Sequence, residues 1–401
     1  MKAPAALLFV LCPLHSAAAS ETPTSLHLLK SYPDATCLDG SPAAYYLREG
    51  SGSNADKWAF SLEGGGECVT QSECDDRKKG NLGSSANYPS TTTLHSTLQT
   101  SDASINPNFH DYNQVFVKYC TGDLHMGQQT ASSPPTLDGV YFAGHHVVAA
   151  VIKDLMASNN LANAAEVVWS GESAGGMGCF NSLDFVADTL ADAGSAATVV
   201  GVPVGGFYYP NDWPYNGTSA YPAEDYIPWT WDALSVYRDL WDAFVPARCA
   251  ASLPSHPERC MLASGVAYET LATPVFVVEA QTDKVVMPLH DGLPDVWNDD
   301  GHPCYNKKGD TCPAEIQEYM LEWSGHMVDA LQAVAGSNRD GVFNPACLLH
   351  TEFSDTWPIL DGMNYVEALQ AWLDSSAEDI AKHVHIDDCG DIFCNPSCAT
   401  K

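Results

Sequence analysis

Short runs of apolar and β-branched residues alternate along the chain with segments whose apolar residues recur every three or four positions. The runs predict strands at 45–47, 58–62, 115–119, 198–204 and 275–280, and another strand that ends near Val168. Apolar residues at 147, 148, 151, 152 and 155 predict a helix over 145–156, and a second helix is expected from 174 to about 192. Buried strands that alternate with helices predict an α/β fold, in which a mainly parallel sheet is flanked by helices.

Three stretches interrupt this alternation. Residues 20–36 are polar, and we expect them to form a loosely held N-terminus. Residues 75–113 are rich in Ser, Thr and Asn without clear periodicity, which predicts a long surface excursion of the kind that often borders an active site. Residues 207–247 are rich in Trp, Tyr and Pro, and we expect them to form a cap.

The N-terminus has the pattern of a cleaved secretory signal. A charged start, Met1-Lys2, is followed by an apolar run to Leu11 and by the small residues Ala17-Ala18-Ala19. The apolar run is shorter than the roughly 20 residues that a membrane span requires. We expect residues 1–19 to be removed and residues 20–401 to form one secreted domain without stable membrane insertion, since no linker or repeat divides them.

The charge balance is strongly acidic, with 50 Asp and Glu residues against 18 Lys and Arg residues and a formal net charge of −32. Nucleic-acid binding is excluded, because phosphate contacts require clusters of Lys and Arg. Anionic membranes and strongly anionic polymers are disfavoured by repulsion. We interpret the charge mainly as an adaptation for solubility.

Fourteen cysteines are present, and Cys12 lies in the expected signal. In an exported chain cysteines mainly form disulfides, and four pairs are close in sequence: Cys68/Cys74, Cys249/Cys260, Cys304/Cys312 and Cys389/Cys394. Zinc is the competing interpretation near Cys398, where His383 and His385 are close, but no C-x-x-C spacing supports it and we expect no metal. An odd number remains after signal removal, and Cys179, in an apolar helical segment, is expected to be the free thiol.

One short motif indicates chemistry. Gly171-Glu172-Ser173-Ala174-Gly175 fits G-x-S-x-G, follows the β-branched pair Val167-Val168 and precedes the second predicted helix. This is the nucleophile elbow of α/β-hydrolases, in which glycines allow a sharp strand-to-helix turn that exposes a serine hydroxyl. Ser173 is therefore the candidate nucleophile.

A serine nucleophile needs a histidine base and a carboxylate that orients the histidine, and α/β-hydrolases supply them in the order Ser, acid, His. Asp283 follows the strand predicted at 275–280, with Glu279 as its rival. For the base, His350 is favoured because the nearby Cys347, if bridged, would hold its loop rigid. His326 remains the alternative.

The negative charge that develops during ester cleavage needs backbone N–H donors. One usually belongs to the residue after the nucleophile, here Ala174, and others to a glycine-rich loop after an early strand. Gly64-Gly65-Gly66, directly after the strand at 58–62, fits that loop.

Several motifs in the same order resemble the family of Notum and plant pectin acetylesterases. They include Leu62–Cys68, the elbow Gly171–Gly176, Val245–Cys249, Pro345–His350 and Cys394–Cys398, and the resemblance extends from about Cys37 to Cys398. It implies a triad of Ser173, Asp283 and His350, with oxyanion donors at Gly65, Gly66 and Ala174. It further implies that Cys37 pairs with Cys120 and Cys68 with Cys74, and that Cys347, Cys389, Cys394 and Cys398 pair among themselves.

The chain departs from this family at the glycine loop. Gly66 and Glu67 stand where relatives carry a bulky aromatic residue, so a carboxylate replaces an apolar wall near the acyl group. A long acyl chain needs a deep apolar pocket, since each buried methylene contributes about 0.8 kcal/mol. Glu67 is therefore a candidate pocket residue. The segment around Cys304 and Cys312 resembles an insertion between acid and base.

These features predict a secreted, monomeric α/β-hydrolase that cleaves carboxylic esters through an acyl-enzyme, without metal or cofactor. An O-acetylated polysaccharide is the preferred substrate, and a fatty-acylated protein is the alternative. A non-catalytic binding protein on a hydrolase scaffold and an acyltransferase are the competing functions. Asn216-Gly217-Thr218 is a candidate glycosylation sequon.

Overall fold

A computed structural model describes residues 22–94, 96, 98–130, 136–210, 212–216, 227–293, 313–376, 379 and 383–398. The expected signal peptide and the Cys304/Cys312 pair lie outside the described residues. The strands are β1 (Thr24–Leu28), β2 (Ala44–Arg48), β3 (Lys57–Leu62), β4 (Thr91–Thr92), β5 (Asn113–Val117), β6 (Glu166–Glu172), β7 (Thr198–Val204), β8 (Phe276–Val278), β9 (Thr282–Asp283), β10 (Gly341–Asn344), β11 (Leu348–Leu349) and β12 (Val384–Ile386). The α-helices are α1 (Gln71–Arg77), α2 (Gly144–Ser158), α3 (Ala174–Asp192), α4 (Trp231–Trp241), α5 (Ala247–Ser252), α6 (Val266–Glu269), α7 (Val286–Asp291), α8 (Ala314–Ala335) and α9 (Tyr365–Leu373).

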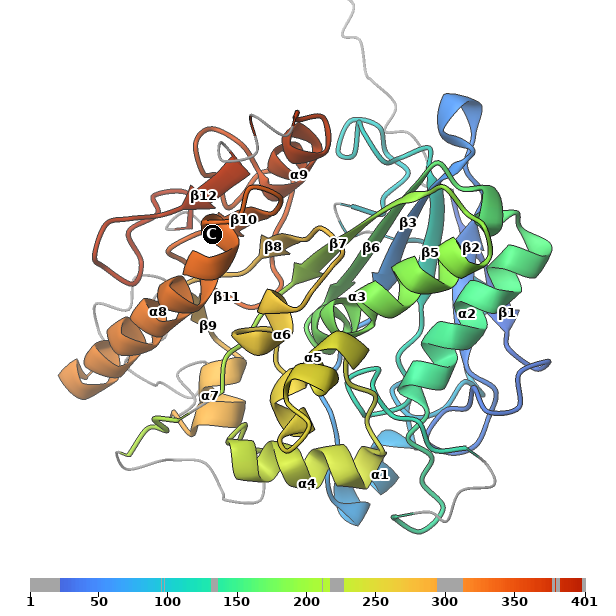
Figure 1. Cartoon of the computed structure of the whole chain (residues 1–401), viewed down its shortest axis with the longest axis horizontal. Coiled ribbons are helices and arrows are strands. Elements are labelled where there is room, and N and C mark those ends of the chain that lie inside the picture. Colours follow the sequence, from blue (N-terminus) through green and yellow to red (C-terminus); the bar gives the residue numbers. More distant parts are fainter. Residues whose placement is uncertain are drawn as a thin grey trace, which may run out of the picture.

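The strands form a 10-stranded sheet in the order β12-β10-β8-β7-β6-β3-β5-β2-β1-β4 (Figure 1). Neighbours from β12 to β5 run parallel, whereas β2, β1 and β4 add antiparallel pairs at one edge. A separate short parallel pair joins β9 to β11. The predicted α/β-hydrolase-like class, with its mainly parallel sheet, is confirmed.

Alternate residues of the central strands enter two different cores, as the period of a strand requires. On β6, Val167 and Trp169 pack in the core beneath α2, α3 and α8, whereas Val168 packs on the opposite face. The helix predicted at 174–192 coincides with α3, and the strand predicted at 198–204 with β7. The strand expected at 115–119 ends earlier, at Val117, because the Tyr119 N–H turns to the Glu63 side chain.

Two expectations about irregular segments were wrong. Residues 24–28 are not loosely held, because β1 pairs with β2 and with β4 and His27 stacks on Tyr45. Residues 75–113 do not lie only at the surface, because Leu98, Phe109 and Tyr112 are buried in the second core, which α9 also covers. Both predictions were based on polar composition. Backbone pairing nevertheless holds the first segment in the sheet, and a few buried apolar side chains hold the second segment in the core.

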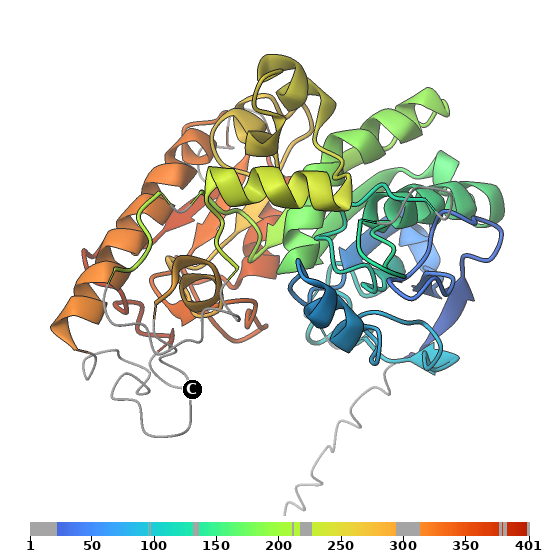
Figure 2. The same ribbon diagram turned by 90° about the horizontal axis from the view of Figure 1, so that it is seen from below.

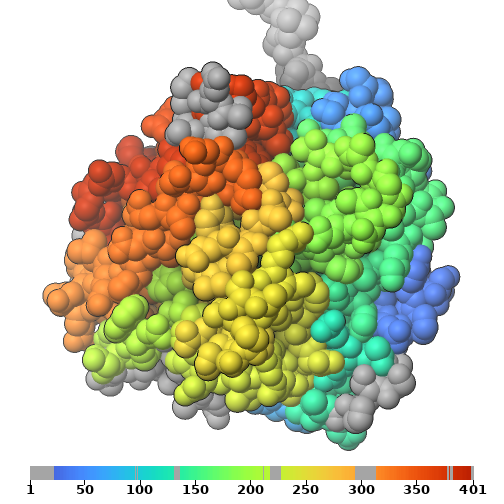
Figure 3. All heavy atoms as spheres, in the orientation of Figure 1, coloured from blue at the N-terminus to red at the C-terminus, as the bar shows by residue number. Residues whose placement is uncertain are grey.

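Helix α4 lies within the predicted cap at 207–247, and α5 and α6 come at its end and after it; the three helices lie between α3 and α8 on one face of the molecule (Figure 3). Figure 1 places α1, α4 and α7 together at the lower edge, and Figure 2 views this edge from below, with α4 crossing it. The chain leaves β3 and β6 at this edge, so the glycine loop and the elbow meet there. In the described part of the chain, no helix is long and apolar enough to cross a membrane.

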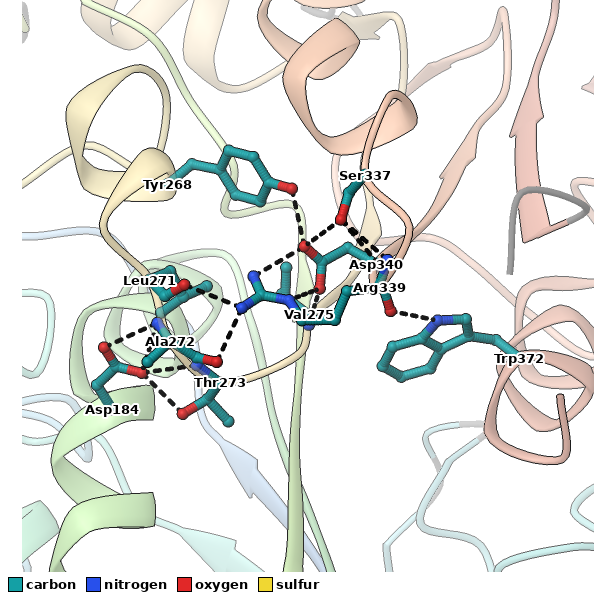
Figure 4. Close-up of polar contacts among 10 residues, drawn as sticks. All are labelled: Asp184, Tyr268, Leu271, Ala272, Thr273, Val275, Ser337, Arg339, Asp340 and Trp372. Atoms are coloured by element: carbon teal, nitrogen blue, oxygen red, sulfur yellow. Dashed lines mark hydrogen bonds and ion pairs between the residues drawn. The ribbon is translucent and has the colours of Figure 1, made fainter. Parts of the chain in front are cut away.

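A polar network ties the second half of the sheet to its helices (Figure 4). Asp340 accepts hydrogen bonds from the Tyr268 hydroxyl at 2.8 Å and from the Val275 N–H at 2.9 Å, and it pairs with Arg339. Arg339 also donates to the Leu271 and Ala272 carbonyls at 3.0 and 2.8 Å. The following residue, Thr273, donates to Asp184 of α3. The network therefore connects α3, the residues just before β8 and the turn before β10.

Candidate active site

Ser173 stands at the turn between β6 and α3 in a conformation that side chains rarely adopt. Its φ is 58° and its ψ is −125°. The flanking glycines are required by close packing, because a Cβ on Gly171 would lie 2.1 Å from the Gly175 carbonyl oxygen. A Cβ on Gly175 would lie 2.0 Å from the Leu62 carbonyl oxygen. Strain of this kind is typical of a nucleophile elbow.

His350 and Asp283 reach Ser173 through the short β9–β11 pair. Leu349 pairs with Asp283, so His350 follows at the end of β11 beside the carboxylate. His350 Nε2 lies 2.7 Å from Ser173 Oγ, and His350 Nδ1 lies 2.7 Å from Asp283 Oδ2. The geometry therefore joins a hydroxyl, an imidazole and a buried carboxylate in one chain of hydrogen bonds.

Asp283 has further donors that hold it as an anion. Its Oδ1 accepts the Val285 and Val286 N–H groups at 2.8 and 2.9 Å, and its Oδ2 accepts the Tyr208 hydroxyl at 2.8 Å. Burial raises the pKa of Asp283, but the positive charge and hydrogen bond of His350, with the backbone donors, outweigh it and the pKa lies below its usual value. Tyr208 was missed by sequence reasoning, because nothing in the aromatic run at 207–209 marks which ring faces the site.

The interaction between Asp283 and His350 shifts the pKa of His350 upward. Burial lowers the pKa of His350, yet the charge of Asp283 and its hydrogen bond exceed this effect, and the net pKa lies above the usual 6.5. The imidazole is therefore prepared to take up a proton from Ser173.

The alternative acid, Glu279, and the alternative base, His326, lie outside the hydrogen-bonded chain of Ser173, His350 and Asp283. Glu279 is fully buried and accepts the Phe207 N–H at 3.1 Å, and burial followed by the charge of Asp283 raises its pKa well above the usual range. His326 lies on α8, where its ring stacks on Trp213 with 4.5 Å between centroids. Neither residue hydrogen-bonds Ser173 or His350 in the described structure.

The glycine loop after β3 packs directly against the elbow. A Cβ on Gly64 would lie 2.9 Å from Ser173 Cβ and 2.5 Å from the Glu172 carbonyl oxygen. Gly65 and Gly66 have φ values of 140° and 64°, which only glycine adopts without strain. The N–H groups of Gly65, Gly66 and Ala174 donate to no atom within the described residues. They are thus available to an oxygen bound beside Ser173.

A cavity of about 40 Å³ opens next to Ser173. Its lining comes from the glycine loop, the loop after β5, the elbow with the first turns of α3, the segment after β7, the segment before α4, α7 with the residue before it, and the end of β11. The lining residues are Gly66, Glu67, Leu124, Ser173, Ala174, Met177, Tyr208, Trp229, Val285, Val286, Leu289, His290 and His350. The described parts of the predicted cap at 207–247 thus supply Tyr208 and Trp229.

One wall of this cavity is polar. The Trp229 indole N–H donates to Glu67 Oε1 at 3.1 Å, and its ring stacks on His290 with 3.5 Å between centroids. Burial raises the pKa of Glu67 to about 7, against the opposing effect of the Trp229 hydrogen bond. Burial lowers the pKa of His290 to about 3, and its Nδ1 lies 2.7 Å from the Ile227 carbonyl oxygen. Both side chains are therefore mainly uncharged between about pH 3 and pH 7.

Ten of the cysteines form disulfides in the described structure: Cys37–Cys120, Cys68–Cys74, Cys249–Cys260, Cys347–Cys398 and Cys389–Cys394. Cys179 is free and buried. The described residues contain no group of three or more His, Cys, Asp or Glu side chains arranged to hold a metal ion.

Comparison with known proteins gives the family. The pectinacetylesterase family model matches residues 17–399. Human palmitoleoyl-protein carboxylesterase NOTUM is 31% identical over 394 residues, which cover 94% of this chain and 73% of the human protein. Pectin acetylesterase 11 of Arabidopsis thaliana is 29% identical over 378 residues, which cover 91% of this chain and 89% of the plant protein. The resemblance seen in the motifs is confirmed: the chain belongs to the pectinacetylesterase family and is an ester hydrolase.

Proposed function

We propose that this protein hydrolyses carboxylic esters through a covalent acyl-enzyme on Ser173. His350 Nε2 takes the Ser173 proton while Oγ bonds to the ester carbonyl carbon, and the protonated imidazole then gives that proton to the departing alcohol. Water attacks the acyl-enzyme with His350 again as base, which releases the carboxylic acid and restores Ser173. The observation that carries the proposal is the pair of 2.7 Å contacts that join Ser173, His350 and Asp283.

The oxyanion of the tetrahedral intermediate would bind to the N–H groups of Gly65, Gly66 and Ala174. These groups have no other acceptor in the described structure, and Gly64 packs on Ser173. Such preorganised donors typically accelerate acyl transfer by roughly 100- to 1000-fold each.

For the acyl group we propose acetate, carried by a polysaccharide. A cavity of about 40 Å³ is close to the roughly 30 Å³ that one water occupies, and far below the roughly 300 Å³ or more of pockets for larger ligands. Its wall contains Glu67 and His290, and a methylene chain laid against buried polar groups gains little. The net charge of −32 favours a neutral glycan over a polyanionic one.

Removal of a fatty acyl group from a protein is the second candidate. The human relative is named palmitoleoyl-protein carboxylesterase and matches 94% of this chain. That activity would require the cavity to open well beyond its present volume.

We further propose that residues 20–401 act as one exported domain after residues 1–19 are removed. Disulfides are typical of oxidising compartments, and the described structure holds five. Asn216 is exposed and remains a candidate for glycosylation, although Gly217 and Thr218 lie outside the described residues.

The test uses purified protein and p-nitrophenyl esters from acetate to octanoate, with Ser173→Ala as the control. We expect the highest kcat/KM with acetate and no turnover by the control. Absence of Ser173-dependent turnover would contradict the esterase mechanism, and a maximum at octanoate would support the second candidate. His350→Ala is expected to abolish turnover and His326→Ala to preserve it. Acetate release from an acetylated neutral glycan, compared with a polygalacturonate, then tests the substrate.

A further inference from the structure

The guanidinium of Arg77, at the end of α1, is bound to the glycine loop. Its Nη2 donates to the Gly65 carbonyl oxygen at 2.6 Å and to the Gly66 carbonyl oxygen at 3.3 Å, and its Nη1 lies 3.5 Å from the Glu67 carbonyl oxygen. The Tyr119 hydroxyl donates to the same Gly66 oxygen at 2.7 Å. Side chains from two other segments therefore hold the loop by its carbonyl groups.

The partners of Arg77 are backbone oxygens and not carboxylates, although the chain is rich in carboxylates. Only 18 Lys and Arg residues are present against 50 Asp and Glu residues. Within the described residues, however, Arg77 forms no ion pair with a carboxylate, and its hydrogen bonds go to backbone oxygens of one loop. A role in surface charge balance would not explain that choice of partners.

Peptide geometry connects these carbonyl bonds to the chemistry at Ser173. A trans peptide is planar, so the carbonyl of Gly65 and the N–H of Gly66 point in opposite directions. When Arg77 holds the carbonyl on one side, it fixes the direction of the N–H on the other. The positive charge also polarises the peptide and makes that N–H a stronger donor.

The loop needs such a restraint. Gly65 and Gly66 both have positive φ, where glycine has the greatest backbone freedom, and the space that a Cβ on Gly66 would enter is open to at least 4 Å. Arg77 is itself well placed, because the Cys68–Cys74 disulfide ties α1 to the end of the loop. A capping box between Thr70 and Glu73 fixes the start of the helix.

We propose that Arg77 is a positioning residue that orients and polarises the Gly65–Gly66 peptide, so that the Gly66 N–H stabilises the oxyanion. The inference rests on the proposed esterase function. Arg77 does not contact the substrate in this scheme, and its effect falls on the transition state rather than on ground-state binding.

The test compares Arg77→Met and Arg77→Lys with Lys79→Met, which removes an exposed cation next to the same helix. With p-nitrophenyl acetate, Arg77→Met is expected to lower kcat by about 10- to 100-fold with KM within about twofold, less than the loss of a whole oxyanion donor. Arg77→Lys should recover part of the loss, and Lys79→Met should match wild type.

An oxyanion-forming inhibitor provides a second readout. Ser173 adds reversibly to trifluoroacetone to give a tetrahedral adduct, with the hydroxyl proton passing to His350. Its inhibition constant should rise in Arg77→Met by a factor similar to the fall in kcat/KM. A merely structural role would instead lower the amount of folded enzyme and leave kcat per active site, titrated with a phosphonate ester, unchanged.

The outcomes are distinct. A folded Arg77→Met enzyme with wild-type kcat, or with an effect on KM alone, overturns the inference. If Arg77→Met does not fold, Arg77→Lys decides, because it should fold and still show a lowered kcat with an unchanged KM. A wild type without Ser173-dependent hydrolysis overturns the proposed function together with the inference.

Discussion

The hydroxyl of Tyr208 donates a 2.8 Å hydrogen bond to Asp283 Oδ2, the same oxygen that lies 2.7 Å from His350 Nδ1. Tyr208 therefore shares the negative charge that would stabilise a protonated His350. Both Tyr208 and Asp283 are buried, so no bulk water replaces either partner easily.

Tyr208→Phe should lower kcat by about 10- to 100-fold, because a buried hydrogen bond to a charged group contributes roughly 1.5–3 kcal/mol and each 1.4 kcal/mol is a factor of about ten. Without this donor Asp283 should attract the His350 proton more strongly and move the acidic limb of the pH–kcat profile to higher pH. Steady-state kinetics from pH 5 to 9 measure both effects. Tyr209→Phe, which removes a hydroxyl bonded to the Trp323 carbonyl on α8, is the control. An unchanged kcat would mean that Tyr208 only fills space.

Activity should fall as the pH is lowered through a pKa above 6.5. His350 must be neutral to accept the Ser173 proton, and its pKa is raised because the charge of Asp283 outweighs burial. Asp283→Asn removes that charge, so burial alone should move the limb below pH 6.5. The same variant should lower kcat by about 10⁴-fold, since the tautomer of His350 is lost. If the acidic limb of the pH profile lay at the same pH in Asp283→Asn and in wild type, its assignment to a His350 paired with Asp283 would be wrong.

Glu67→Leu should widen the acyl range. With an apolar side chain in the cavity wall, each added methylene of the acyl group can gain up to about 0.8 kcal/mol. We expect kcat/KM for p-nitrophenyl butyrate, relative to acetate, to rise by about tenfold over wild type. Glu67→Gln keeps the size and polarity and should retain the preference for acetate. If the ratio of kcat/KM for butyrate to that for acetate were the same in wild type, Glu67→Leu and Glu67→Gln, Glu67 would not limit acyl length.

Glu67 should also make stability depend on pH. Burial raises its pKa from 4.5 to about 7, so its neutral form is favoured in the folded state. The folded protein therefore loses stability as the pH rises through about 7. Between pH 5 and pH 8 the unfolding free energy of wild type should fall by roughly 2–3 kcal/mol relative to Glu67→Gln. Urea denaturation of both proteins, with disulfides intact, measures the difference, and parallel pH profiles would refute it.

Asp340→Ala should destabilise the network of Figure 4 without touching Ser173. It removes the acceptor of Tyr268, Val275 and Arg339 from a site where Asp340 is fully buried. Arg339 is partly exposed and can be solvated, so the main cost is that of the buried Tyr268 and Val275 donors left without an acceptor, about 1–3 kcal/mol each. Asp239→Ala, at an exposed pair with Arg238, should cost less than about 1 kcal/mol. Denaturant midpoints give both values.

The local pattern of the sequence was enough to predict the elbow and the elements around it. Ser173 has to follow a strand and precede a helix, and the glycines beside it are required by backbone contacts that any such turn creates. The glycine loop after β3 was predictable for the same reason. These features depend on residues adjacent in the chain, where steric rules act directly.

Position in the sequence could not decide between His350 and His326, because both follow Asp283. The pairing of β11 with β9 brings His350 to 2.7 Å from Ser173 Oγ, whereas α8 carries His326 to a different contact with Trp213. Polar composition misled the prediction for residues 20–36, because β1 is held by backbone hydrogen bonds, which any residue can form.

The sequence by itself therefore determined the fold class, the family motifs and the identity of the candidate nucleophile. Only the tertiary structure decided which side chains surround it: Tyr208 on Asp283, Arg77 on the Gly65 carbonyl, and Glu67 with His290 in the wall of the cavity. The physical reason is distance along the chain. Each of these contacts depends on how separate segments pack, and cavity size follows from all of them together.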